Sequence, residues 1–279
     1  MESSADRIII PEYSQFVPCL EHRFRPGSHR LSSVAFNQHH QNPGLCAQPG
    51  LGQGKPPVFL RNMADVADAE VVSPADAKPQ GIWPIDENGD LIQEEGVQIK
   101  SANFTSVSQL IGPDSAYADA FRGGTLTHTF LDVNDYHRYH FPVSGTVLEM
   151  RKIKDTNGLG GIIEWDPVTQ RYILEDAIPG WQMIETRDCV IIGTDEYGLV
   201  AVLPIGMSQI CSCNWEENLT VGSKVEKGDP MGYFLFGGSD IVMVFQAGVH
   251  VELLCPPDET GTGYSHILMG ESYARLSAD

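Results

Sequence analysis

The sequence predicts a mainly β fold of the α+β class, with antiparallel sheets and a few short helices. Two observations predict it. Stretches in which β-branched or aromatic residues alternate with polar ones recur along the chain, with turn-forming residues between them. Helical periodicity is scarce, and one short stretch is the best candidate for a helix. A chain of 279 residues, of which 42% are hydrophobic, can bury the core that such a fold needs.

Four stretches are expected to form strands. In the last of them, Val249, Val251 and Leu253 would share one face of a sheet, because side chains alternate along a strand. The four stretches are 125–133, 145–153, 189–205 and 239–254.

The remaining segments divide the chain. Residues 106–112, SVSQLIG, are expected to form the helix, after a Ser or Thr cap. Residues 154–188 contain Gly-Leu-Gly-Gly and Pro-Gly-Trp and are expected to be irregular. Residues 37–57 form a loop rich in Pro, Gly and Gln. We therefore expect an N-terminal segment over residues 1–60 and one main domain over residues 61–279.

Two segments resemble the halves of a biotinyl/lipoyl-type barrel-sandwich, in which tight turns join short strands. They are PVSGTVLEM (142–150) and VGSKVEKGDPMGYF (221–234), whose glycines and Asp229 would form the turns. No lysine stands at the usual attachment tip, so a swinging-arm carrier is not expected. The pattern predicts a barrel-sandwich core.

The composition excludes several classes of partner. The net charge is −19, from 37 acidic and 18 basic residues, and both nucleic acid and anionic membrane surfaces repel such a protein. The start of the chain does not resemble a signal peptide, and the longest apolar run, 198–207, is far shorter than the about 20 residues of a membrane helix. The six cysteines include no C-x-x-C pair and are expected to be reduced. We expect a cytoplasmic protein with no stable membrane anchor, and a homo-oligomer is possible.

Three short motifs contain residues suited to catalysis. DYHRYHFP (135–142) holds His137 and His140, which could be two metal ligands or two structural histidines at a strand end. No further ligand stands at matching spacing, so no metal is expected. Asp76 in VVSPADA and Ser239 after two glycines would each, taken alone, be turn residues.

Taken together, these motifs resemble the phosphatidylserine decarboxylase family, and the resemblance extends from about residue 13 to residue 254. The motifs occur in the family's order. They are YSQFVPCLEHRFRPGSHRL (13–31), VVSPADA (71–77), IKSANFTSVSQLIG (99–112), FRGGTLTHTFLDVNDYHRYHFPVSG (121–145), IGMSQI (205–210) and FGGSD (236–240).

The resemblance implies a self-processing enzyme. Ser239 would attack the carbonyl of Gly238, cutting the chain into residues 1–238 and 239–279 and leaving Ser239 as a covalent pyruvoyl cofactor. His140 would be the base for this cleavage, oriented by Asp76. The pyruvoyl group would form a Schiff base with the substrate amine and act as an electron sink. His137 would serve the decarboxylation, at the protonation step.

The substrate stays open. Asp240 follows the serine, where the family usually has Thr or Ser, and its carboxylate could slow the elimination or be tolerated. Only about a dozen residues precede the motif at residue 13, where membrane-bound members carry a hydrophobic region. Three hypotheses follow. The first is a decarboxylase of a free L-amino acid, with an aromatic one the first to test. The second is a phosphatidylserine decarboxylase that docks transiently on the membrane or whose anchor lies outside this sequence, and the third is a non-cleaving binding protein on the same fold.

Overall fold

Strand β13, Ser239–Phe245, lies in the interior of a seven-stranded antiparallel sheet. The computed structural model describes residues 63–92, 106–132, 135–154, 161–167, 171–176, 186–206, 213–234 and 239–278. The order of strands in this sheet is β11-β5-β8-β9-β13-β3-β2. Their bounds are β2 Lys78–Pro84, β3 Thr125–Leu131, β5 Gly145–Ile153, β8 Arg187–Gly193, β9 Leu199–Gly206 and β11 Lys224–Val225.

Three smaller antiparallel sheets accompany it, with the orders β1-β15-β14, β10-β12-β4 and β6-β7. The described chain also has a 3-10 helix, η1, at Met63–Asp65 and an α-helix, α2, at Val107–Ile111. The strand bounds are β1 Glu70–Val72, β4 Arg138–His140, β6 Gly161–Asp166, β7 Arg171–Asp176, β10 Cys213–Trp215, β12 Pro230–Phe234, β14 Val249–Leu253 and β15 Ser272–Ala278.

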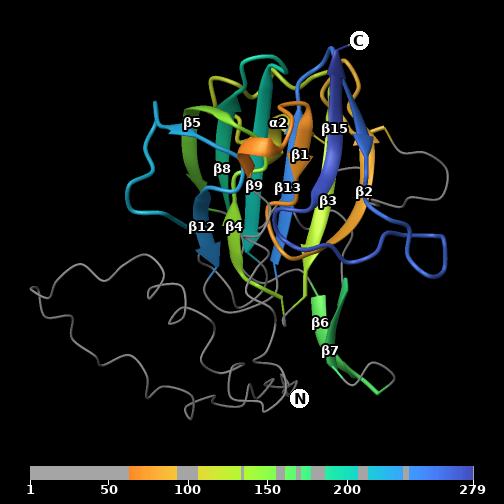
Figure 1. The fold of residues 1–279 in the computed structure, drawn as a ribbon. Coiled ribbons are helices and arrows are strands. Elements are labelled where there is room, and N and C mark those ends of the chain that lie inside the picture. The colour runs from red at the N-terminus through yellow and green to blue at the C-terminus, as the bar shows by residue number, and fades with distance from the viewer. Residues whose placement is uncertain are drawn as a thin grey trace, which may run out of the picture. The chain divides into compact units, whose positions relative to one another are not determined.

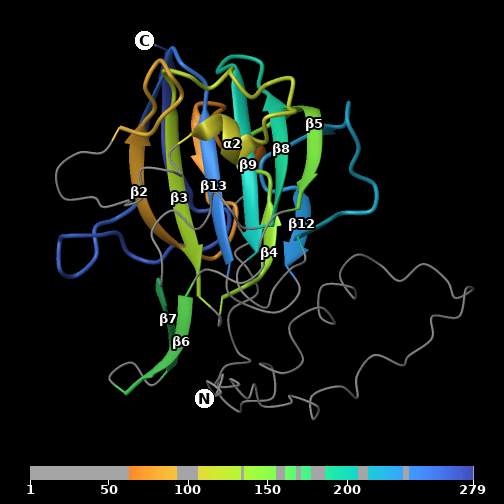
Figure 2. The ribbon, with the colours of Figure 1, turned by 180° about the vertical axis from the view of Figure 1, so that it is seen from behind.

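The large sheet has an apolar core on each face. Alternate residues of β13 point to opposite faces, so Ile241 and Met243 join one core while Val242 and Val244 join the other. The first core also takes residues from β1, β4, β12 and β15, and the second takes residues from α2. Figure 1 shows β1 and β15 in front of the sheet, and Figure 2, from behind, shows α2 in front of it. The sheet is therefore covered on both faces.

The predicted fold class is confirmed: the described chain is mainly antiparallel β-structure with few helices. Strands β3 and β5 and helix α2 lie where the sequence predicts them. The stretch 189–205 is two strands, β8 and β9, because residues 194–198 turn the chain and Gly198 takes a φ of +65° there. The stretch 239–254 is likewise split into β13 and β14.

The expectation of an irregular segment over residues 154–188 is wrong in part. Strands β6 and β7 pair in register from Gly161–Asp176 to Asp166–Arg171. Both carry β-branched and aromatic residues around the turn residues Asp166 and Pro167, a hairpin signal that the flanking glycines obscured.

The two barrel-sandwich segments do meet. Strand β11 pairs with the start of β5, through Lys224 with Thr146 and Val225 with Gly145. The turn that follows β11 is tight, as expected: the Asp229 carboxylate accepts a hydrogen bond from the backbone N of Glu226 at 2.9 Å, and Gly228 has a φ of +80°. A complete barrel-sandwich core stays a prediction.

Three further expectations concern the cysteines, membrane helices and the N-terminal segment. Cys189, Cys213 and Cys255, the cysteines in the described ranges, are buried and form no disulfide. Within those ranges no helix is long and apolar enough to cross a membrane. The segment 1–60 lies outside the described residues, so its boundary stays a prediction.

Arg187 of β8 donates hydrogen bonds to helix α2, and its substitution tests how much this contact stabilises the fold. Its side chain is buried, with Nε donating to the carbonyl of Leu110 and Nη2 to that of Gln109, both at 2.7 Å. Both carbonyls belong to the last turn of the helix; that of Gln109 also accepts from the backbone N of Gly112 at 3.2 Å, whereas Leu110 is buried. We expect Arg187→Met to lower the free energy of unfolding by about 1–3 kcal/mol, since the buried carbonyl of Leu110 loses its donor. Urea unfolding of the Ser239→Ala chain measures it.

Arg275→Met is the control for that experiment. Arg275 makes a surface ion pair with Glu252 at 3.5 Å, and the two side chains are 59% and 56% exposed. Its loss should change the free energy of unfolding by less than about 1 kcal/mol. Equal losses in the two variants would contradict the assigned role of Arg187.

Candidate active site

Residue 239 begins β13 where the two neighbouring strands end. Its backbone pairs with Leu131, the last residue of β3, and with Gly206, the last residue of β9. The chain after Leu131 leads within a few residues to Asp135 and His137. The N-terminus of β13 and the histidine motif therefore lie at the same end of the large sheet, the lower end in Figure 1. Gly238 lies outside the described residues.

His140 is held by backbone on two sides. Its N–H donates to the carbonyl of Pro74 at 2.8 Å, and its residue pairs with Pro230 of β12. Ring atom Nδ1 lies 2.8 Å from the carbonyl oxygen of Gly228, in the tight turn before β12. The Tyr136 ring stacks on the imidazole, with centroids 6.0 Å apart. The ring orientation of His140 thus depends on three segments that are distant in sequence.

These contacts set the protonation state of His140. A carbonyl oxygen only accepts, so Nδ1 carries the hydrogen and Nε2 is the acceptor nitrogen of the neutral ring. The hydroxyl of Tyr136 lies 3.4 Å from Nε2, a long hydrogen bond. Burial lowers the pKa of His140 from its ordinary 6.5 to about 4. At neutral pH the ring is uncharged and Nε2 is a proton acceptor.

His137 has different surroundings from those of His140. Its Nδ1 lies 2.7 Å from the backbone carbonyl of Asp135, which again makes Nε2 the acceptor nitrogen, and its ring meets Phe234 edge-on with centroids 6.2 Å apart. Burial lowers the pKa of His137, against the opposing effect of Asp135. The two histidines, three residues apart, thus contact different groups and can do different work.

Asp76 follows β1 in a turn that Ser73 closes by donating to the carbonyl of Ala75 at 2.7 Å. Its Oδ1 accepts a hydrogen bond from the backbone N of Met269 at 2.8 Å. Burial raises the pKa of the Asp76 carboxyl. Its described contacts include no hydrogen bond to His140, so an orienting role stays a prediction. Its charge does act on Tyr136, whose pKa is raised to about 12, mainly by burial.

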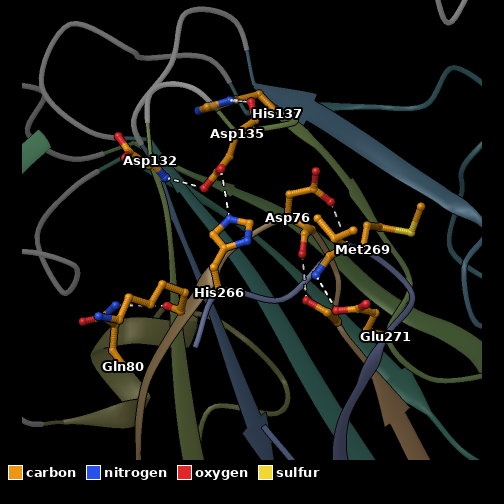
Figure 3. Close-up of polar contacts among 12 residues, drawn as sticks. Asp76, Gln80, Asp132, Asp135, His137, His266, Met269 and Glu271 are labelled. Atoms are coloured by element: carbon orange, nitrogen blue, oxygen red, sulfur yellow. Dashed lines mark hydrogen bonds and ion pairs between the residues drawn. The ribbon is translucent and has the colours of Figure 1, made fainter. Parts of the chain in front are cut away.

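Figure 3 shows a network at this site that the motifs did not predict. The Asp135 carboxylate accepts a hydrogen bond from the backbone N of Asp132 at 2.8 Å and lies 3.0 Å from His266 Nε2. Asp135 and His266 act on Asp76 in opposite directions: the charge of Asp135 raises its pKa and that of His266 lowers it. Asp135 stood inside the quoted motif, but no signal in the sequence marked His266. No group of three or more metal-ligating side chains occurs in the described ranges.

The lowered pKa of His140 predicts a pH-dependent contribution to stability. The unfolded chain binds this proton near pH 6.5 and the folded chain only near pH 4, so the contribution is present at neutral pH and is lost as the pH falls through that window. In the uncleaved Ser239→Ala chain, the difference in free energy of unfolding between His140 and His140→Gln should shrink by about 2 kcal/mol from pH 7.5 to pH 5. Urea titrations at both pH values measure it. A constant difference would contradict the buried, neutral ring.

Comparison with known proteins gives a family. The family model for phosphatidylserine decarboxylase matches residues 55–275. A phosphatidylserine decarboxylase proenzyme of Ruminiclostridium cellulolyticum is 32% identical over 65% of this chain and 54% of its own length. The decarboxylase iboD of Amanita muscaria is 31% identical over 51% of this chain and 43% of its own length. The L-tryptophan decarboxylase of Psilocybe cubensis is 29% identical over 56% of this chain and 37% of its own length.

The chain thus spans about half or less of the length of these relatives. The family match, however, covers most of the chain and includes Asp76, His137, His140 and Ser239. This protein belongs to the phosphatidylserine decarboxylase family.

Proposed function

We propose that this protein is a self-processing, pyruvoyl-dependent decarboxylase. The observation that carries the proposal is His140: a buried, neutral imidazole with Nε2 as its acceptor nitrogen, in the motif near the start of β13. A serine hydroxyl is a weak nucleophile and needs such a base. The same site holds two carboxylates, Asp76 and Asp135, and two further histidines, His137 and His266. These groups fit the chemistry of a substrate that carries an amine.

The proposed cleavage passes through an ester at residue 239. His140 takes the proton of the Ser239 hydroxyl, whose oxygen adds to the Gly238 carbonyl, and the acyl group passes from nitrogen to oxygen to form an ester. Loss of the α-proton expels residues 1–238 with a free carboxylate and leaves a dehydroalanine at 239. Water replaces its nitrogen, ammonia leaves, and a pyruvoyl group remains on residue 240. Asp76 is proposed to support His140, in this structure through Tyr136 and not by direct contact.

The residues at the site fit a pyruvoyl group at position 239. The group supplies a ketone that condenses with an amine and withdraws electrons, as pyridoxal phosphate does. Residue 239 is held by backbone pairing on both sides, which fixes its place. His137 uses Nδ1 for its hydrogen bond to the Asp135 carbonyl, so Nε2 lies on the other side of the ring. His137 is proposed to donate the proton that replaces CO2 on the substrate carbon.

A free L-amino acid, aromatic first, is the proposed substrate. Two matched relatives are named as a decarboxylase and an L-tryptophan decarboxylase, and the net charge of −19 opposes residence at an anionic membrane. Phosphatidylserine is the alternative, favoured by the name of the bacterial relative. Both substrates present an α-amino acid to the same chemistry. A non-cleaving binding protein is the third possibility.

Self-cleavage is the first prediction from this proposal. The purified protein should run as two chains, with the smaller beginning at residue 239 and blocked to Edman sequencing. Ser239→Ala, His140→Ala and Asp76→Asn should each remain one chain of 30.6 kDa. His137→Ala should still be cut but lose decarboxylation by on the order of 100-fold. Gel electrophoresis and intact mass measure the cleavage, and CO2 release measures the decarboxylation.

Full cleavage of all three single variants would contradict the assignment of base and nucleophile. An uncleaved His137→Ala, or a cleaved and fully active one, would show that the two histidines are assigned the wrong way. Borohydride should abolish activity in the cleaved wild type, which ties the loss to a carbonyl group.

The substrate prediction needs a direct comparison. Cleaved enzyme should release CO2 from a free aromatic L-amino acid and stay in the supernatant when phosphatidylserine vesicles are sedimented, since like charges repel. A panel of free amino acids and dispersed phosphatidylserine is assayed side by side, with borohydride-treated enzyme as the blank. Turnover of phosphatidylserine without turnover of any free amino acid would refute the proposed substrate. It would leave the proposed decarboxylase activity intact.

A further inference from the structure

The residue that follows the proposed cut carries a buried carboxylate. Asp240 is the second residue of β13, with a side chain 1% exposed. It lies between Phe130 of β3 and Ile205 of β9. Its face of the strand also bears Val242 and Val244, which belong to the apolar core that includes α2. A carboxylate in such surroundings is unfavourable without a partner.

His128 of β3 supplies that partner. Its Nε2 lies 2.5 Å from Oδ2 of Asp240. In the strand register His128 stands opposite Val242, so the contact runs diagonally across the two strands. A carboxylate accepts, so Nε2 carries a hydrogen. The His128 side chain is only 14% exposed, and its ring centroid lies 6.5 Å from that of Trp83.

We infer that His128 is a positioning residue for self-cleavage. It holds the Asp240 carboxylate on the face of the sheet that α2 covers, and so keeps the start of β13, and the Gly238–Ser239 peptide bond before it, in place. This inference rests on the proposed function. It also accounts for the acidic residue at a position where the sequence raised the question of slower processing.

Two physical effects would follow from losing His128. A buried carboxylate without its partner would draw the end of the strand toward water, which displaces the peptide bond one residue away. Its charge would also oppose the negative charge that develops on the Gly238 carbonyl oxygen during attack. Both effects slow cleavage, and both disappear if residue 240 is uncharged.

A double-mutant cycle tests this coupling. His128→Val should slow cleavage at least about tenfold, whereas Asp240→Ser, which loses the contact but leaves no buried charge, should slow it much less. The double variant His128→Val/Asp240→Ser should recover most of the loss, since it buries no charge. His128→Gln keeps an N–H donor and should lose much less than His128→Val. Rates are taken from pulse-labelled protein on denaturing gels.

Lys152→Met is the matched control. It leaves Asp188, a carboxylate with a side chain 3% exposed on the same sheet, without the ammonium that lies 2.8 Å away. Asp188 belongs to β8, separated from β13 by β9. This variant should lose stability but keep its cleavage rate, because it does not touch the start of β13. Melting temperatures of all variants on the Ser239→Ala chain separate stability from rate.

Each outcome decides between the claims. An uncleaved wild type would refute the proposed function itself. A cleaved wild type with an unimpaired His128→Val, or a double variant as slow as His128→Val, would refute the role of His128 and leave the proposed function intact. If His128→Val does not fold, the rates of His128→Gln and of the double variant carry the same decision. Equal slowing by Lys152→Met would reduce the effect to stability.

Discussion

Strand β13 is paired along its whole length, with β3 on one side and β9 on the other. The rest of the site depends on this pairing. It places residue 239 at the end of a rigid element, with the ends of both neighbouring strands beside it. A cut at this point would leave the new end of the smaller chain bound in the sheet, since β3 and β9, which pair with β13 through backbone hydrogen bonds, belong to the larger chain.

Because β13 is paired on both sides, side chains near its start are also buried. Groups near the start of β13 are shielded from water, so their charge states are set by neighbours and not by solvent. His140 stays neutral because its ring is buried, and burial outweighs the hydrogen bond to the Gly228 carbonyl, which favours the charged ring. Asp240 is buried equally deeply and is matched by His128. The proposed base, His140, and the Asp240 carboxylate thus have different partners on different elements.

Asp135, in the segment that follows β3, contacts two histidines. Asp135 binds His266 through its carboxylate and His137 through its backbone carbonyl, so one residue holds both histidines (Figure 3). The like charges of Asp76 and Asp135 disfavour each other, and His266 offsets part of that repulsion.

The class of fold could be predicted from the sequence, and the residues proposed for catalysis could be picked out in it. Alternation along β3 and β5 and the helical stretch at α2 are local patterns, so they could be read without the structure. The hairpin β6-β7 could not, because the glycines around it outweighed a short alternating signal. The motif with His137 and His140 was visible for the same local reason, since its residues are neighbours in the chain.

The groups that these residues contact could not be predicted from the sequence, because they come from distant parts of the chain. The partner of His140 is 88 residues away at Gly228, that of Asp240 is 112 residues away at His128, and that of Asp135 is 131 residues away at His266. Each contact depends on strand register or on the path of a loop, and a shift of one residue would turn every side chain of a strand to the other face. Register results from the packing of both cores together, which no local stretch of sequence encodes.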